Sequence, residues 1–309
     1  MKFKTILATG AALAFLSAAV CVHAQNLNGT VNAGFYGSPL AIQTINTGFG
    51  NAAGGNDSAG GSELDAAYGR ISGGNLYLFL AGNVENNGNH LNVFIAGGAA
   101  GGQNVLNAPA TGTLATMNGS IFSSGFNATF AYDVNDFSGT QYSEEYNLIA
   151  NTGGYVGSLG NSGTGIYAGI DGTGQSTVGT ISLYGNNNNA STMGAAGAAS
   201  TGGGASTTTG YELVIPLSSI GYGGGNIMVL ADINGGGDGY LANQFLPGLA
   251  VGTGNVGGGG PYTGSSSSQF NFANTAGEFF TVAGVPEPAT MAFLGLFSLA
   301  SLLAIRRRK

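Results

Sequence analysis

The chain has 309 residues and a formal net charge of -7; only 7% of its residues are charged, whereas 43% are hydrophobic and 59 are glycine. This composition excludes a charge-rich disordered chain and leaves enough apolar side chains for a packed core. Apart from Arg70, every lysine and arginine lies within the first four or the last four residues. Because phosphate binding requires several cations, we predict that the middle of the chain binds no nucleic acid.

Residues 1–24 have the three-part layout of a secretory signal peptide: two lysines, an apolar run and a small residue at Ala24. We predict an N-terminal signal helix that is cleaved after Ala24. An uncleaved anchor helix is one alternative, but the apolar run is short for a span of ~20 residues. Lipidation at Cys21 is another, but Val20 is larger than the residue such a site prefers. Cys21 is the only cysteine, so the mature protein would contain no disulfide.

Residues 25–284 are predicted to form one exported all-β domain. Short runs rich in Val, Ile, Leu, Tyr and Phe alternate there with Gly, Asn and Ser, which is typical of β-strands and turns. The runs are 75–80, 91–96, 126–134, 166–170, 178–184, 211–215, 227–233 and 278–282. We predict an antiparallel two-sheet β-sandwich, jelly-roll-like, with long Gly/Asn/Ser-rich loops at 185–210 and 257–268.

Two features of the early strands lead to local predictions. The runs 75–80 and 91–96 are joined by a segment that contains Asn87-Gly88, which favours an antiparallel hairpin with a long loop. His90 lies in this segment, and we predict a solvated loop histidine rather than a general base. Apolar and polar residues alternate over 126–134, which predicts one buried face.

Five stretches of the middle carry a resemblance to a known group of domains: 62–68, 76–78, 81–87, 92–95 and 211–217. They are similar to DOMON-like and family-nine carbohydrate-binding-like sandwiches. The resemblance implies a sandwich that binds sugar or haem. The chain has no tryptophan for a sugar platform and no recognisable haem-ligand strands, so the resemblance favours the fold more than a ligand.

A polar loop follows the predicted strand 227–233. Asp232, Asn234 and Asp238 offer oxygen atoms in a glycine-rich segment, and such hard ligands suit calcium. Turn formation alone also explains Asn-Gly and Asp-Gly. We therefore keep two interpretations of this loop, a calcium site and a turn, and predict no other cofactor.

Aromatic residues in predicted loops are a second candidate site. Tyr36, Tyr240 and Phe245 could stack on sugar rings by their apolar faces, and ordinary packing is the alternative. We find no convergent set of catalytic groups in the sequence. The exported domain is therefore predicted not to be an enzyme.

The C-terminal end again has three parts. They are Pro286-Glu287-Pro288, an apolar stretch over 291–305, and Arg306, Arg307, Arg308 and Lys309. The stretch predicts a transmembrane helix whose basic tail stays in the cytoplasm.

Residues 285–309 thereby resemble the PEP-CTERM sorting signal. The resemblance implies passage through the secretion machinery and an inner-membrane-anchored precursor. An exosortase would then remove the helix. Proteins with this signal are linked to exopolysaccharide and biofilm.

We therefore predict an exported, non-catalytic protein of the cell surface or extracellular matrix, associated with exopolysaccharide. The alternatives are a carbohydrate-binding module for an extracellular polysaccharide and an extracellular hydrolase.

Overall fold

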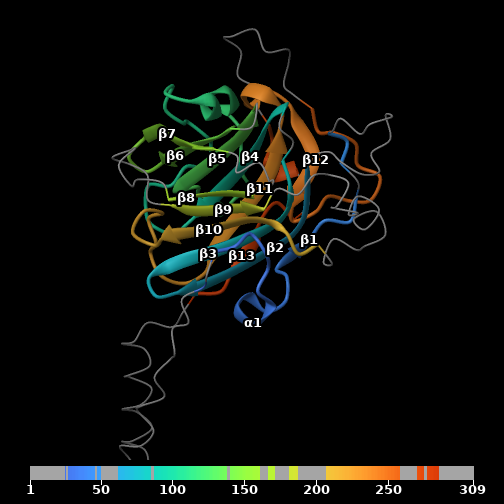
Figure 1. Cartoon of the computed structure of the whole chain (residues 1–309). Helices are drawn as coiled ribbons and strands as arrows, with labels where there is room; N and C mark the ends of the chain where they lie inside the picture. The colour runs from blue at the N-terminus through green and yellow to red at the C-terminus, as the bar shows by residue number, and fades with distance from the viewer. Residues whose placement is uncertain are drawn as a thin grey trace, which may run out of the picture.

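The fold is taken from a computed structural model of the chain (Figure 1). It describes residues 25–284 apart from 26, 46, 50–61, 85–86, 138–139, 161–165, 171–180, 187–206, 258–269 and 275–276. The predicted signal helix, the C-terminal helix and most of the two predicted long loops lie outside the described residues. No helix in the described part of the chain is long and apolar enough to cross a membrane.

The first sheet is antiparallel, with the strand order β1-β2-β3-β10-β9-β8. Its strands are β1 (Ala41–Ile42), β2 (Glu63–Ser72), β3 (Asn75–Asn83), β8 (Ile166–Ile170), β9 (Ser182–Asn186) and β10 (Gly210–Pro216). A short helix, α1 (Ala33–Tyr36), covers part of its outer face, where aromatic side chains pack together.

The second sheet is also antiparallel and has the order β12-β11-β4-β5-β6-β7, with β13 paired to β11. Its strands are β4 (Asn87–Ala96), β5 (Phe130–Phe137), β6 (Thr140–Asn147), β7 (Thr152–Gly160), β11 (Ile227–Asn234), β12 (Leu241–Leu246) and β13 (Phe280–Val282). Among the described residues of its connections there are three short 3-10 helices: η1 (Thr113–Met117), η3 (Gly236–Asp238) and η4 (Phe272–Asn274).

The two sheets pack face to face around one hydrophobic core. Leu78 and Leu213 of the first sheet and Val93 and Val229 of the second belong to the same cluster of buried side chains. The strands therefore form two layers, as Figure 1 shows. The predicted all-β fold with two antiparallel sheets is confirmed.

The predicted hairpin between 75–80 and 91–96 is wrong. β3 pairs with β2 and β10, whereas β4 pairs with β5 and β11 in the other sheet. The chain therefore crosses between the layers after β3. Both strands are central in their sheets, and strands covered on both faces have nearly continuous apolar sequences. Their similar sequences therefore do not indicate that they pair with each other.

The jelly-roll connectivity is also not what the described strands show. β4, β5, β6 and β7 follow one another as neighbours in one sheet, and β8, β9 and β10 do so in the other. These are meanders, whereas a jelly roll is built from Greek keys.

The outer face of the second sheet is largely covered by the long connections. Phe94 and Leu230 pack there with Leu114 and Phe272 from these connections. Both faces of β5 are consequently buried, and Asp133 on its outer face is only 1% exposed. The alternation over 126–134 predicts only one buried face. It does not indicate that the long connections cover the other face.

Candidate functional site

Polar residues form a row across the outer face of the second sheet, beside the apolar cluster. The register places Asp232 of β11 opposite Asn92 of β4, and Asn92 opposite Asp133 of β5. Asp133 in turn lies opposite Glu144 of β6, and Glu144 opposite Tyr155 of β7. Cross-strand neighbours have Cβ atoms about 5 Å apart, so five strands contribute to one continuous polar surface.

His90 lies in the adjoining row, on β4, and its predicted place in a solvated loop is wrong. It is 3% exposed, and its Nδ1 lies 2.9 Å from Asp133 Oδ1. Nε2 accepts hydrogen bonds from the backbone amide of Gly237 at 3.2 Å and from Asn135 Nδ2 at 2.8 Å. β4 begins at Asn87, so His90 lies on a strand and not in the loop.

Two influences act on the protonation of His90 in opposite directions. Burial lowers its pKa, but the charges of Asp133 and Asp238 outweigh burial and raise the pKa. An amide N–H cannot accept a hydrogen bond, so the Gly237 contact requires a lone pair on Nε2. We assign the neutral tautomer with the proton on Nδ1, where it is donated to Asp133, because the Gly237 donor is fixed by the backbone.

Thr113, at the start of η1, forms hydrogen bonds with two carboxylates of the polar row, those of Asp133 and Glu144. Its hydroxyl donates to Asp133 Oδ2 at 2.8 Å and also lies 3.3 Å from Glu144 Oε2. Its backbone amide donates to Glu144 Oε2 at 3.0 Å, and Tyr146 OH donates to the same oxygen. The carboxylates in the row are therefore held in fixed positions by protein donors.

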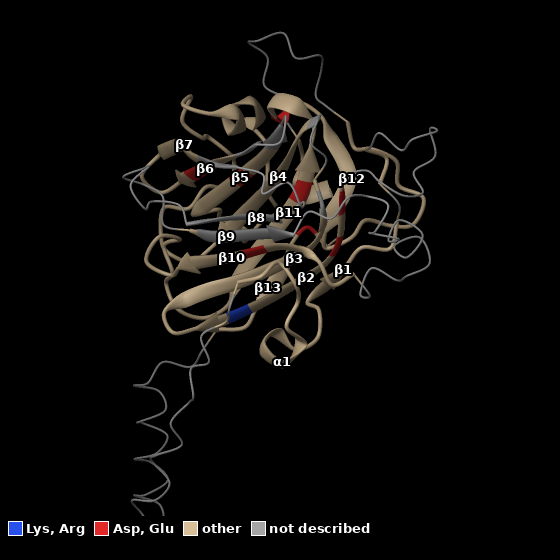
Figure 2. Cartoon of the chain, viewed as in Figure 1, with Lys and Arg blue, Asp and Glu red and all other residues tan. Residues whose placement is uncertain are grey.

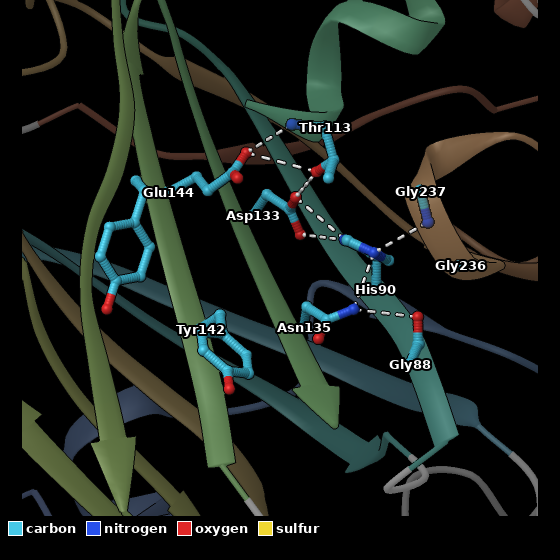
Figure 3. Close-up of a pocket in the computed structure, with 10 residues that line it drawn as sticks. Gly88, His90, Thr113, Asp133, Asn135, Tyr142, Glu144, Gly236 and Gly237 are labelled. Carbon is cyan, nitrogen blue, oxygen red and sulfur yellow. Dashed lines mark hydrogen bonds and ion pairs between the residues drawn. The ribbon is translucent and has the colours of Figure 1, made fainter. Parts of the chain in front are cut away.

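A pocket of about 440 Å³ opens above this row (Figure 3). Its lining residues are Gly88, His90, Thr113, Asp133, Asn135, Tyr142, Glu144, Tyr155, Gly236 and Gly237. Tyr142 and Tyr155 form its exposed wall, with exposed fractions of 40% and 56% and ring centroids 6.4 Å apart. The pocket thus combines two exposed aromatic rings with fixed polar groups.

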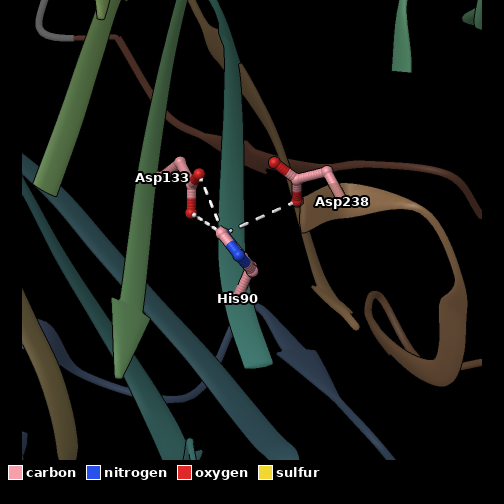
Figure 4. Close-up of side chains that lie close together, drawn as sticks. All are labelled: His90, Asp133 and Asp238. Atoms are coloured by element: carbon pink, nitrogen blue, oxygen red, sulfur yellow. Dashed lines mark hydrogen bonds and ion pairs between the residues drawn. The ribbon is translucent and has the colours of Figure 1, made fainter. Parts of the chain in front are cut away.

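His90, Asp133 and Asp238 come close enough to hold a metal ion, with ligand atoms within 4.8 Å of one another (Figure 4). Their hydrogen bonds argue against this set. Nδ1 of His90 faces both oxygens of Asp133, at 2.9 and 3.0 Å, and donates its proton there. Nε2 is occupied by Gly237, so neither ring nitrogen is a free ligand.

The structure brings together two of the three residues predicted to bind calcium. Asn92 Nδ2 donates to Asp238 Oδ1 at 2.9 Å and lies 3.3 Å from Asp232 Oδ1. Asn234 is not part of this group, because its side-chain oxygen accepts from the amides of Gly235 and Tyr240. The contacts of Asn234 are thus those of a turn residue and not those of a calcium ligand.

The predicted sugar-stacking residues are not gathered at one site. Tyr36 and Phe245 are 7% and 1% exposed and pack in hydrophobic clusters, so they are unavailable for stacking. The hydroxyl of Tyr36 donates to Glu212 at 2.9 Å. Tyr240 is 47% exposed and stacks on Phe49, with 5.8 Å between ring centroids.

The two exposed tyrosines of the pocket are not among the residues predicted from the sequence. Tyr142 and Tyr155 belong to β6 and β7, and neither strand is among those predicted from the sequence. Period-2 alternation of Tyr142, Glu144 and Tyr146 was the signal that could have revealed β6.

Comparisons with known proteins bear on the end of the chain. The model of the PEP-CTERM protein-sorting motif matches residues 284–309, so the chain carries this motif. The motif implies an exported, membrane-anchored precursor that an exosortase processes at the cell surface. No curated protein and no solved structure matches the chain, and the resemblance of the middle to DOMON-like sandwiches stays a prediction.

Proposed function

We propose that the exported sandwich is a non-catalytic protein of the cell surface or extracellular matrix, associated with exopolysaccharide. The observation that carries the proposal is the sorting motif, which follows directly on a folded β-sandwich. Export and exosortase processing follow from the motif. The motif does not by itself specify a role in the extracellular matrix, and this role is our proposal.

The hydrogen bonds of the pocket support a non-catalytic role. Asp133 and Glu144 both line it, as a pair of carboxylates in a glycosidase would. Asp133, however, is 1% exposed, and its oxygens accept from His90 and Thr113. A buried carboxylate that is already hydrogen-bonded on both oxygens is poorly placed to attack a substrate or to activate water.

Saccharide binding in this pocket is the more specific function that we favour. Tyr142 and Tyr155 offer exposed ring faces, on which the apolar face of a sugar can stack. Asn135 and Glu144 stand on the neighbouring strands of the same pocket and offer hydrogen bonds to hydroxyl groups. This arrangement of a few fixed polar groups beside aromatic rings is usual for small-molecule sites.

Affinity electrophoresis of the full chain in detergent, in gels that contain the exopolysaccharide of the producing cells, tests the binding proposal. We expect retardation of the native chain and at least about tenfold weaker retardation of a Tyr142→Ala/Tyr155→Ala variant, because each stacked ring contributes about 1 kcal/mol. Tyr222→Ala, which removes a tyrosine outside the pocket, is the control. Equal migration of the native chain with and without polysaccharide would contradict saccharide binding.

A reducing-end assay on the same polysaccharide tests the non-catalytic role separately. We expect no release of reducing ends above the level of a Glu144→Gln variant. Release that depends on Glu144 would show a hydrolase and overturn the proposal.

A further inference from the structure

We propose that Asn92, Asp232 and Asp238 bind a single calcium ion buried behind the pocket. The three residues come from β4, β11 and the end of η3. The site differs from the predicted set, because Asn92 replaces Asn234. It does not depend on saccharide binding.

Backbone geometry brings the three side chains together. Asn92 and Asp232 are cross-strand partners, so their side chains lie side by side on one face of the sheet. Asp238 has φ +56, a left-handed conformation that residues other than glycine rarely adopt. The hydrogen bonds from Asn92 Nδ2 to both aspartates, at 3.3 and 2.9 Å, hold the two carboxylates against one amide group.

Each of the three side chains keeps one oxygen without a hydrogen-bond partner. These atoms are Asn92 Oδ1, Asp232 Oδ2 and Asp238 Oδ2, and all three residues are 0% exposed. A buried polar atom left unpaired costs about 1–3 kcal/mol, and more when it carries charge. Three such oxygen atoms in adjoining side chains indicate a bound cation that they coordinate.

The charge of the cluster also requires a partner. Buried carboxylates are normally paired with a cation or bound to a metal. Arg70, the single lysine or arginine in the described part of the chain, donates to the carbonyl of Phe35 and lies 4.9 Å from the centroid of its ring. Among the described residues no lysine or arginine forms an ion pair, and the His90 ring, whose Nδ1 lies 3.8 Å from Asp238 Oδ1, is neutral in the tautomer assigned above. Acidic residues occur on strands of both sheets (Figure 2).

The donor atoms select the class of cation. Two carboxylates and an amide oxygen are hard ligands, which Ca²⁺, Mg²⁺ and Mn²⁺ prefer. The nearby sulfur atom, Met117 Sδ, accepts from the amide nitrogens of Asn92 and Asn234, both at 3.5 Å. It is therefore not counted among the ligands of the cation. Calcium tolerates irregular geometry, which suits ligands from two strands and a turn, and an exported protein meets it at high concentration.

Calorimetric titration of the full chain with CaCl₂, in detergent after removal of metal by EDTA, tests the site. We expect one ion per chain with a Kd between about 10⁻⁶ and about 10⁻³ M, and a thermal midpoint that rises with calcium concentration. Asp232→Asn and Asp238→Asn should each weaken binding at least about tenfold, because each removes one of the two charges. Asparagine accepts the left-handed backbone at 238, so that variant keeps the fold.

Glu63→Gln is the matched control, because Glu63 is a buried carboxylate of the other sheet with an unpaired oxygen. It should leave the calcium affinity unchanged. If the aspartate variants fail to fold, elemental analysis of the native chain purified without chelator decides, and one calcium per chain is expected. Absence of binding at about 10 mM CaCl₂, or a response to Mg²⁺ or Mn²⁺ but not to Ca²⁺, would overturn the proposal. Unchanged affinity in the Asp232→Asn/Asp238→Asn double variant would do the same.

Discussion

Glu63 and Asp65 on β2 form a second group of buried carboxylates, with exposed fractions of 3% and 0%. Burial, and then the charge of Asp65, raises the pKa of Glu63 to about 9. Burial raises the pKa of Asp65 to about 6. Between these two pKa values the pair therefore carries one proton, on Glu63.

We expect the free energy of unfolding to fall as the pH rises between about 6 and about 9, in buffer with EDTA. The pKa of Glu63 is about 9 in the fold against an ordinary value of 4.5, so below pH 4.5 both states hold the proton and full stability is present. Above that pH the unfolded chain releases the proton first, and Glu63 alone contributes a loss of at most about 1.4 kcal/mol per pH unit. Urea unfolding at several pH values measures this slope.

Glu63→Gln should give a shallower slope, since the amide does not titrate. Asn28→Asp, which places a carboxyl group on the partly exposed N-terminal segment, is a control whose slope should match that of the native chain. A Glu63→Gln slope equal to the native one would mean that Glu63 is ionised in the fold.

Only part of the candidate site could be predicted at the level of single residues. Asp232 and Asp238 stand in a polar, glycine-rich segment, which is enough to predict both as ligands from the sequence. Asn92 and Asp133 each stand among apolar residues of their strands, and only the register of β4 between β5 and β11 makes them neighbours. A single sequence contains no signal for that register, because it depends on long-range pairing.

At the scale of elements, strands with continuous apolar runs were predicted well. β8 has the bounds expected from 166–170, and β10 and β11 differ from theirs by one or two residues. β7 was missed because its sequence, Thr152–Gly160, is rich in glycine and polar residues. The crossing from β3 to β4 was misjudged because a turn signal such as Asn87-Gly88 fixes a bend but not the partner strand.

Gly82 on β3 explains one irregularity of the first sheet. The register of β2 with β3 shifts between Leu64 and Ala66, next to Gly82, which has φ +150. A Cβ atom at this position would lie 2.1 Å from the carbonyl oxygen of Glu63. Glycine is thus required for the close approach of the two backbones.

Gly82→Ala should lower the free energy of unfolding by at least about 2 kcal/mol, through backbone strain and this contact. Gly254→Ala is the matched control, because a Cβ there meets nothing within 4 Å, and its effect should stay within about 0.5 kcal/mol. Chemical denaturation measures both. Equal stability of the two variants would show that β2 moves to accommodate the alanine.

At the scale of the whole molecule, processing would change the charge of the protein. Residues 25–284 contain thirteen acidic residues and one arginine, a formal net charge of -12, because the remaining cations lie in the two ends. Such a charge favours solubility and resists association with other anionic surfaces.

Mass spectrometry of the native protein from the cell envelope and the culture supernatant should find a C-terminus near Pro286-Glu287-Pro288. The apolar stretch and the basic tail should be absent, because the motif implies cleavage by an exosortase. A Pro286→Ala/Pro288→Ala variant should keep the full C-terminus and remain in the membrane fraction. Native protein that ends at Lys309 in every fraction would rule out processing.

The pairing of β13 with β11 determines which way an attached molecule would face. Val282 pairs with Ile227 at the start of β11, and the amide of Gly284 donates to Asn226 at 3.0 Å, so the chain is fastened to the sheet up to the sorting motif. Asn234, beside the pocket, ends the same strand roughly 23 Å away, at about 3.3 Å per residue. In a molecule held by its C-terminus, the pocket would therefore lie at the end of β11 opposite the point of attachment.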